Sequence, residues 1–176
     1  MCTTLILRPS YLKIRVEPLK FLEHIQGDIC GPIQPLSGPF RHFMVLIDAS
    51  TRWSHVRLLS TRNHAFAKII AQVIKLKAQY LEHQIQSIRM DNAAEFSSQV
   101  FNDYCKALGI QVQHFIPYVH TQNGLAKSLI KRIELIARLL LQTSNLPTSC
   151  WGHVVLHAAH LIQCVQLHII QPPRCN

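Results

Sequence analysis

The feature that most constrains the fold is a change in the spacing of apolar residues along the chain. Residues 44–47, MVLI, form a continuous apolar run, which is typical of a strand buried on both faces. After Asn63 the apolar residues recur at intervals of three and four, which is the spacing of one helix face. A chain that alternates between these two periods is expected to build a sheet with helices packed against it.

The periods predict a definite order of elements. Strands are predicted over residues 21–30, 40–49, 53–60, 85–90 and 110–115. Helices are predicted over residues 63–81, 100–110, 125–142 and 148–162. The short polar ASTR, residues 49–52, predicts a hairpin, and Gly109 predicts the end of a helix. The order describes a mixed sheet flanked by helices, an α/β domain.

Composition narrows the class of partner. The chain has 176 residues, 48% of them hydrophobic, so one well-packed domain is expected rather than disorder. A net charge of +9, from 18 basic and 9 acidic residues, suits a polyanionic partner, although charge alone does not separate nucleic acid from an anionic membrane, and many basic domains bind neither. No apolar run approaches the roughly 18 residues of a membrane span, and no secretory signal begins the chain. The six cysteines form no C-x-x-C pair, which predicts reduced thiols and an intracellular protein.

Two aspartates come at the ends of predicted strands. Asp28 stands in GDICGP and Asp91 in IRMDNAAEF. Ligands of α/β sheets bind beside strand ends, and two carboxylates brought together there are stable mainly when a cation such as Mg²⁺ bridges them. Taken alone, an aspartate at a strand end is more often a turn or cap residue.

The longer motifs make this site more specific. GDICGPI, IRMDNAAEF and YCKALGIQVQHFIPYVHTQNG closely resemble the catalytic core of a copia-type LTR retrotransposon integrase, over about residues 18–163. The resemblance implies a ribonuclease-H-like fold with a five-stranded mixed sheet, and DNA cleavage and strand transfer that depend on Mg²⁺ or Mn²⁺. It also implies DNA as the partner, association as a homo-oligomer and, for a working enzyme, a nuclear location. No membrane partner is expected, since no apolar run is long enough to span a membrane.

The resemblance assigns a role to each catalytic position. Asp28 and Asp91 match the two metal-binding aspartates, and Lys127 stands where the family has its glutamate, with 35 residues between it and Asp91. An ammonium group has three donors and no acceptor, so it cannot ligate Mg²⁺. We therefore expect Lys127 to pair with one of the aspartates and the chain to lack strand transfer. The alternative is a non-catalytic nucleic-acid-binding remnant of a transposable element, and a nuclease of the same fold is a weaker third option.

Three other acids lie near enough in the sequence to be candidates for replacing the missing glutamate. Glu134 lies seven residues past Lys127, about 10.5 Å along the same helix, which is too far for the same ion. Nothing in the sequence places Glu95 at the site, and Asp48 matches a family position that is not a metal ligand. Rescue by another acid is not expected.

Basic residues gather on the helix that carries Lys127. Lys127, Lys131 and Arg138 fall on one side of it, with Arg132 nearby, and the corresponding helix of integrases lies against DNA. A solvated helix face explains the same pattern equally well.

Further along the chain, four metal-ligand residues recur at helical spacing: His153, His157, His160 and Cys164. One helix, however, offers two or at most three ligands to a single ion. We therefore expect these histidines to be ordinary packing or surface residues rather than zinc ligands.

Three segments are expected. Residues 1–20 form an N-terminal linker or arm, residues 21–163 the core domain, and residues 164–176 a tail produced by a frameshift. Codons for CVQLHIIQPPRCN can be chosen so that a shifted frame spells RPTAYHSTSPLQ, which resembles the family's continuation. Residues read in the wrong frame are expected to pack poorly, because random sequence rarely agrees with a fold at every level.

Overall fold

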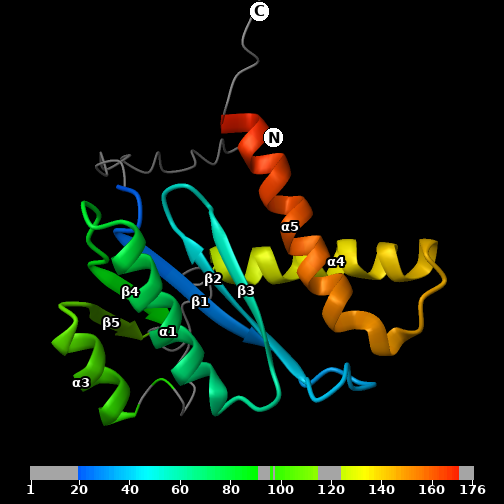
Figure 1. Cartoon of the computed structure of the whole chain (residues 1–176), viewed down its shortest axis with the longest axis horizontal. Helices are drawn as coiled ribbons and strands as arrows, with labels where there is room; N and C mark the ends of the chain where they lie inside the picture. The colour runs from blue at the N-terminus through cyan, green and yellow to red at the C-terminus, as the bar shows by residue number, and fades with distance from the viewer. Residues whose placement is uncertain (1–19, 91–95, 97, 115–123, 171–176) are drawn as a thin grey trace, which may run out of the picture.

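The computed structural model describes residues 20–90, 96, 98–114 and 124–170 (Figure 1). The strands are β1 (His24–Cys30), β2 (His42–Asp48), β3 (Ser54–Leu59), β4 (Ser87–Met90) and β5 (Gln111–His114). The helices are α1 (His64–Gln79), α3 (Gln99–Ala107), α4 (Gly124–Thr143) and α5 (Trp151–Ile170), with a 3₁₀ turn, η1 (Thr148–Cys150), before α5. The predicted α/β order is confirmed.

The strands form one mixed sheet in the order β3-β2-β1-β4-β5. β1 pairs antiparallel with β2 and parallel with β4, so it is central, and Asp28 lies opposite Val45. β2 and β3 form the predicted hairpin. The carboxylate of Asp48 closes its turn by accepting hydrogen bonds from the N–H and the hydroxyl of Thr51, at 2.8 and 2.6 Å. Asp48 is therefore a turn residue.

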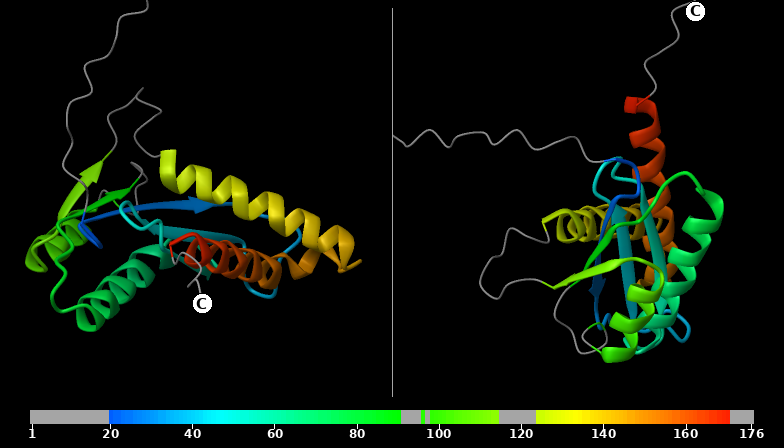
Figure 2. Two further views of the ribbon diagram at one scale, coloured as in Figure 1. Left: turned by 90° about the horizontal axis from the view of Figure 1, so that it is seen from above. Right: turned by 90° about the vertical axis from the view of Figure 1, so that its left-hand side faces the viewer.

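The continuous apolar run of β2 is explained by helices on both sides of the sheet. Phe43 and Val45 point into a core shared with α4 and α5, whereas Met44 and Leu46 point into a core shared with α1 and α3. Figure 2 shows α4 and α1 on opposite sides of the strands. Because successive side chains of a strand alternate between faces, both sets must be apolar.

The helix ends follow local chemistry. The hydroxyl of Ser98 accepts the N–H of Phe101 at the start of α3, and Gly109 follows α3 with a φ of +74°, as predicted for a terminating glycine. α5 is longer than predicted, because it continues past Ile162 to Ile170. The residues QCVQLHII contain no proline or glycine to stop the helix there. The described residues contain no helix long and apolar enough to cross a membrane.

Candidate functional site

Asp28 lies near the end of the central strand, on the face covered by α4. Its side chain is 8% exposed, and one of its oxygens accepts the backbone N–H of Ile29 at 3.0 Å. The antiparallel register sets Asp28 beside Val45, whose side chain belongs to the core under α4 and α5. A carboxylate on the face toward α4 is what the predicted site requires.

The second predicted aspartate lies outside the described residues. Asp91 directly follows Met90, the last residue of β4, and Glu95 also falls within the undescribed stretch. The parallel register of β1 and β4, which pairs Gln26 with Arg89, is consistent with the order of strands that the prediction assumes. The proximity of Asp28 and Asp91 therefore stays a prediction.

Lys127 belongs to the first turn of α4 and is exposed. Lys131, Arg132 and Arg138 are exposed as well, while the helix turns Ala126 and Leu129 toward the core. At 100° per residue, Lys127, Lys131 and Arg138 fall within about 40° of one another, and Arg132 lies roughly 100° further round the helix. The pairing of Lys127 with one of the two aspartates stays a prediction.

One contact beside Asp28 was not predicted from the sequence. The thiol of Cys30 donates a hydrogen bond to Oε1 of Glu134 at 3.0 Å, joining β1 to α4. Burial, the bond to Glu134, and the charges of Glu134 and Asp28 raise the pKa of Cys30 to about 12. The sequence did hold a signal, because Cys30 is two residues past Asp28 and must share its face of the strand. Its partner depends on how α4 crosses the sheet, which the sequence does not reveal.

The metal-binding capacity of the described residues is limited. In this part of the chain no group of three or more His, Cys, Asp or Glu side chains is arranged to hold an ion. Cys30, two residues past Asp28, donates its thiol proton in a hydrogen bond to Glu134. Of the three predicted positions, Asp28 supplies a carboxylate and Lys127 cannot ligate. The described residues alone do not fit a two-metal site.

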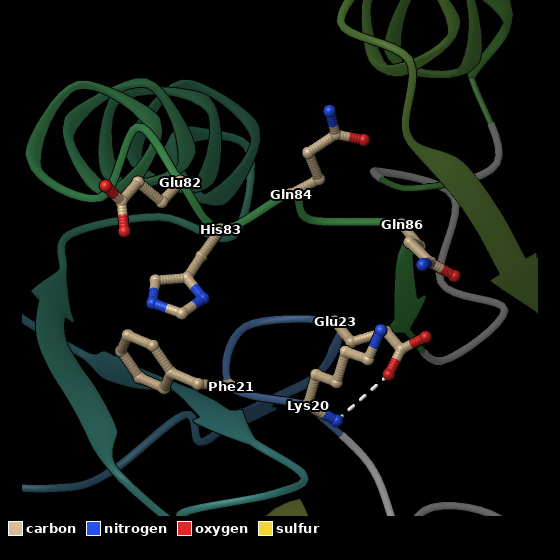
Figure 3. Close-up of a pocket in the computed structure, with 7 residues that line it drawn as sticks. All are labelled: Lys20, Phe21, Glu23, Glu82, His83, Gln84 and Gln86. Carbon is tan, nitrogen blue, oxygen red and sulfur yellow. Dashed lines mark hydrogen bonds between the residues drawn. The ribbon is translucent and has the colours of Figure 1, made fainter. Parts of the chain in front are cut away.

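Two small hollows lie near the other end of β1. The one in Figure 3, of about 230 Å³, is lined by Lys20, Phe21, Glu23, Glu82, His83, Gln84 and Gln86. There the backbone N–H of Lys20 donates to Glu23 at 2.9 Å, and the ring of Phe21 meets His83 edge-on. A second hollow, of about 210 Å³, includes His24, Gln26 and Arg89, on the same sheet face as Asp28. These hollows carry polar groups but no pair of carboxylates facing one another.

Comparison with known proteins agrees with this architecture. Residues 20–120 match the model of the integrase core domain family. A Pol polyprotein from transposon TNT 1-94 of Nicotiana tabacum is 29% identical over 156 residues, covering 88% of this chain and 12% of the polyprotein. The Gag-Pro-Pol polyprotein of bovine leukemia virus (isolate Australian) is 29% identical over 75 residues, covering 39% of this chain and 5% of that polyprotein. This chain thus spans a small part of either relative.

A solved structure shares the fold. A chain in the cryo-EM structure of the simian T-cell lymphotropic virus intasome, in complex with PP2A regulatory subunit B56 gamma, superposes with a TM-score of 0.68. The match has 18% sequence identity and covers 96% of this chain and 62% of that chain. The sheet order, the helices on both faces and this likeness define a ribonuclease-H-like α/β domain. The chain belongs to the integrase core domain family, and its predicted resemblance to a retrotransposon integrase core is confirmed.

Proposed function

We propose that the chain is the integrase core of a retrotransposon Pol polyprotein, which serves DNA integration, and that Lys127 leaves it without strand transfer. The observation that carries this proposal is the position of Asp28. It is a buried carboxylate on the central strand, on the face against which α4 packs. α4 also carries Lys127, which the family resemblance assigns to the position of the third acid.

The chemistry of two-metal catalysis explains the loss. One ion activates the attacking oxygen and the other stabilises the leaving oxygen, so the ligands must balance about four positive charges. Three carboxylates supply about three negative charges. Two aspartates and a lysine together supply a net of only about one negative charge. When bound, Mg²⁺ or Mn²⁺ would supply this activation, with Asp28 and Asp91 as its ligands. We expect such binding to be impaired here.

Titration calorimetry with Mn²⁺ tests the metal site. The unaltered chain should bind Mn²⁺ weakly or not at all, and Lys127→Glu should restore binding by replacing a donor with a carboxylate. The double variant Lys127→Glu with Asp28→Asn is the matched control, and it should lose what Lys127→Glu gains. Equal, tight binding by the unaltered chain and by Lys127→Glu would mean that Lys127 does not block the site.

A non-catalytic role in nucleic-acid binding is the second candidate. It is supported by the exposure of Lys127, Lys131, Arg132 and Arg138 on α4. Phosphate contacts of this kind need neither the third acid nor a metal ion. DNA binding is therefore expected to survive the loss of catalysis, and a working relative would act in the nucleus, where chromosomal DNA lies.

We also propose three segments, with a core at residues 21–163, an arm at residues 1–20 and a frameshifted tail at residues 164–176. A contact of α5 with β3 supports a core that extends to residue 163. Ile162 is 1% exposed and Gln163 donates a hydrogen bond to the backbone oxygen of Ser54, whereas Cys164 and Val165 are exposed. The proposed junction thus comes directly after a residue that contacts β3, and Gln166 beyond it is again half-buried.

A further inference from the structure

The outer face of α5 carries a row of metal-ligand side chains. At 100° per residue, His153, His157, His160 and Cys164 fall within an arc of about 60°. All four are exposed, whereas Val155, Ala158 and Ile162 on the opposite side are buried. Packing inside the domain therefore does not account for the row, because its side chains face away from the core.

Two members of the row already have the spacing of ligands on one ion. Sγ of Cys164 lies 3.5 Å from Nε2 of His160, one turn apart on the helix. In tetrahedral zinc sites Zn–S is about 2.3 Å and Zn–N about 2.0–2.1 Å, which sets neighbouring sulfur and nitrogen ligands about 3.5 Å apart. Little rearrangement is needed for this pair to hold a zinc ion.

A closed tetrahedral site needs four ligands, and this helix presents two at the right spacing. In the described part of the chain no third ligand joins them, since no group of three is arranged to hold a metal. We propose that two copies of this chain bring their α5 helices together about a two-fold axis, and that each copy contributes His160 and Cys164 to one shared zinc ion.

The surface around the pair suits a second copy. Leu156 and Leu161 flank the row on either side and are 40% and 37% exposed, so two crossing α5 helices would bury them. An isologous contact uses the same patch on both partners, as a two-fold axis requires. The C-terminal turns of α5 extend beyond the ends of the strands (Figures 1 and 2).

Charge favours the same face. The chain has a net charge of +9, yet no Asp, Glu, Lys or Arg occurs between Trp151 and Ile170. Two copies can therefore approach through α5 without the repulsion expected between strongly basic surfaces. Imidazole must be neutral and the thiol deprotonated to bind zinc, so assembly should release protons and weaken as pH falls.

Light scattering and Co²⁺ spectroscopy of the purified full chain, kept reduced with a phosphine, test the proposal. Zn²⁺ should double the mass of the metal-free species with one ion per two chains, and a chelator should reverse the change. Co²⁺ should give the thiolate charge-transfer band and the strong visible bands of a tetrahedral site. These signals should vanish in Cys164→Ser and in His160→Ala, both exposed positions where substitution should not impair folding.

His153→Ala is the matched control, because His153 lies on the same face about 10.5 Å from His160 along the helix. Its mass change and spectrum should equal those of the unaltered chain. A mass that does not change with Zn²⁺, or a Co²⁺–thiolate band that persists in Cys164→Ser, would overturn the proposal. The proposal does not depend on catalytic activity, so its failure would leave the integrase assignment untouched.

Discussion

The thiol of Cys30 donates a hydrogen bond to the carboxylate of Glu134 over 3.0 Å, and this contact ties the central strand to α4. Cys30 is two residues beyond Asp28 on the same strand, so the contact lies beside the candidate site. Burial, followed by the bond and charge of Glu134, raises the pKa of this thiol to about 12. At neutral pH Cys30 is therefore a protonated hydrogen-bond donor at the edge of the candidate site.

The raised pKa predicts a loss of stability in alkaline solution. Between the ordinary thiol pKa of 9.0 and the folded value of about 12, the unfolded chain releases the Cys30 proton while the folded chain keeps it. The free energy of unfolding contributed by this thiol is therefore complete below pH 9 and declines as pH rises toward 12. Thermal unfolding across pH 8–11 should show this decline.

Cys30→Val removes the titrating group and should make the decline shallower. Part of it should remain, because burial also raises the pKa of Cys105 to about 11. An unfolding profile with the same pH dependence in the variant and in the unaltered chain would contradict the assignment.

DNA binding is predicted to depend on the exposed row of α4. Lys131→Glu with Arg138→Glu should weaken binding to duplexes of any sequence, because phosphate contacts are largely independent of sequence. Each lost phosphate contact should also reduce the slope of log affinity against log salt by about 1. Fluorescence anisotropy at several salt concentrations measures both effects.

Lys106→Glu is the matched control for this prediction, since Lys106 is an exposed basic residue on α3, on the other side of the sheet. It changes the total charge by the same amount per substitution. If it weakens binding as much per substitution as the α4 changes do, net charge rather than the α4 surface governs binding.

The aromatic cluster beneath α3 is predicted to be essential to stability. Phe101 is fully buried, with its ring centroid 5.7 Å from that of Phe66 and 5.8 Å from that of Phe96. Phe101→Ala should lower the free energy of unfolding by about 3–5 kcal/mol through lost burial and a cavity. Its neighbour Val100 is 67% exposed, so Val100→Ala should change the free energy by less than about 0.5 kcal/mol in urea unfolding. Similar losses in both would show that α3 does not pack as described.

The origin of residues 164–176 is tested by the nucleotide sequence. A single lost base near Cys164 predicts that the neighbouring frame encodes RPTAYHSTSPLQ, in place of CVQLHIIQPPRCN. Reading the genomic DNA settles the matter, and a different peptide in that frame would rule out the frameshift. The zinc proposal survives either result, since it depends on where Cys164 lies and not on how it arose.

The order of strands and helices could be predicted from the sequence, because the spacing of apolar residues differs between the two kinds of element. The strand buried on both faces, β2, and the helix after Asn63, α1, both appear as predicted. The predicted end of α5, Ile162, was wrong by eight residues. The first helix-breaking residue after it is Pro172. Contacts between distant elements were harder to predict. Nothing in the sequence says that Glu134 crosses β1 at Cys30, since that depends on the angle and height at which α4 packs.

The most direct measurement of the central claim is Mg²⁺- or Mn²⁺-dependent cleavage and joining of a terminal DNA substrate by the purified chain. The unaltered chain should produce no joined DNA, because we propose that Lys127 replaces a metal-binding acid and an ammonium cannot ligate the ion. Lys127→Glu is compared in parallel, with Asp28→Asn as the background. Metal-dependent joining by the unaltered chain, abolished by Asp28→Asn, would contradict the account and show that Lys127 is compatible with catalysis.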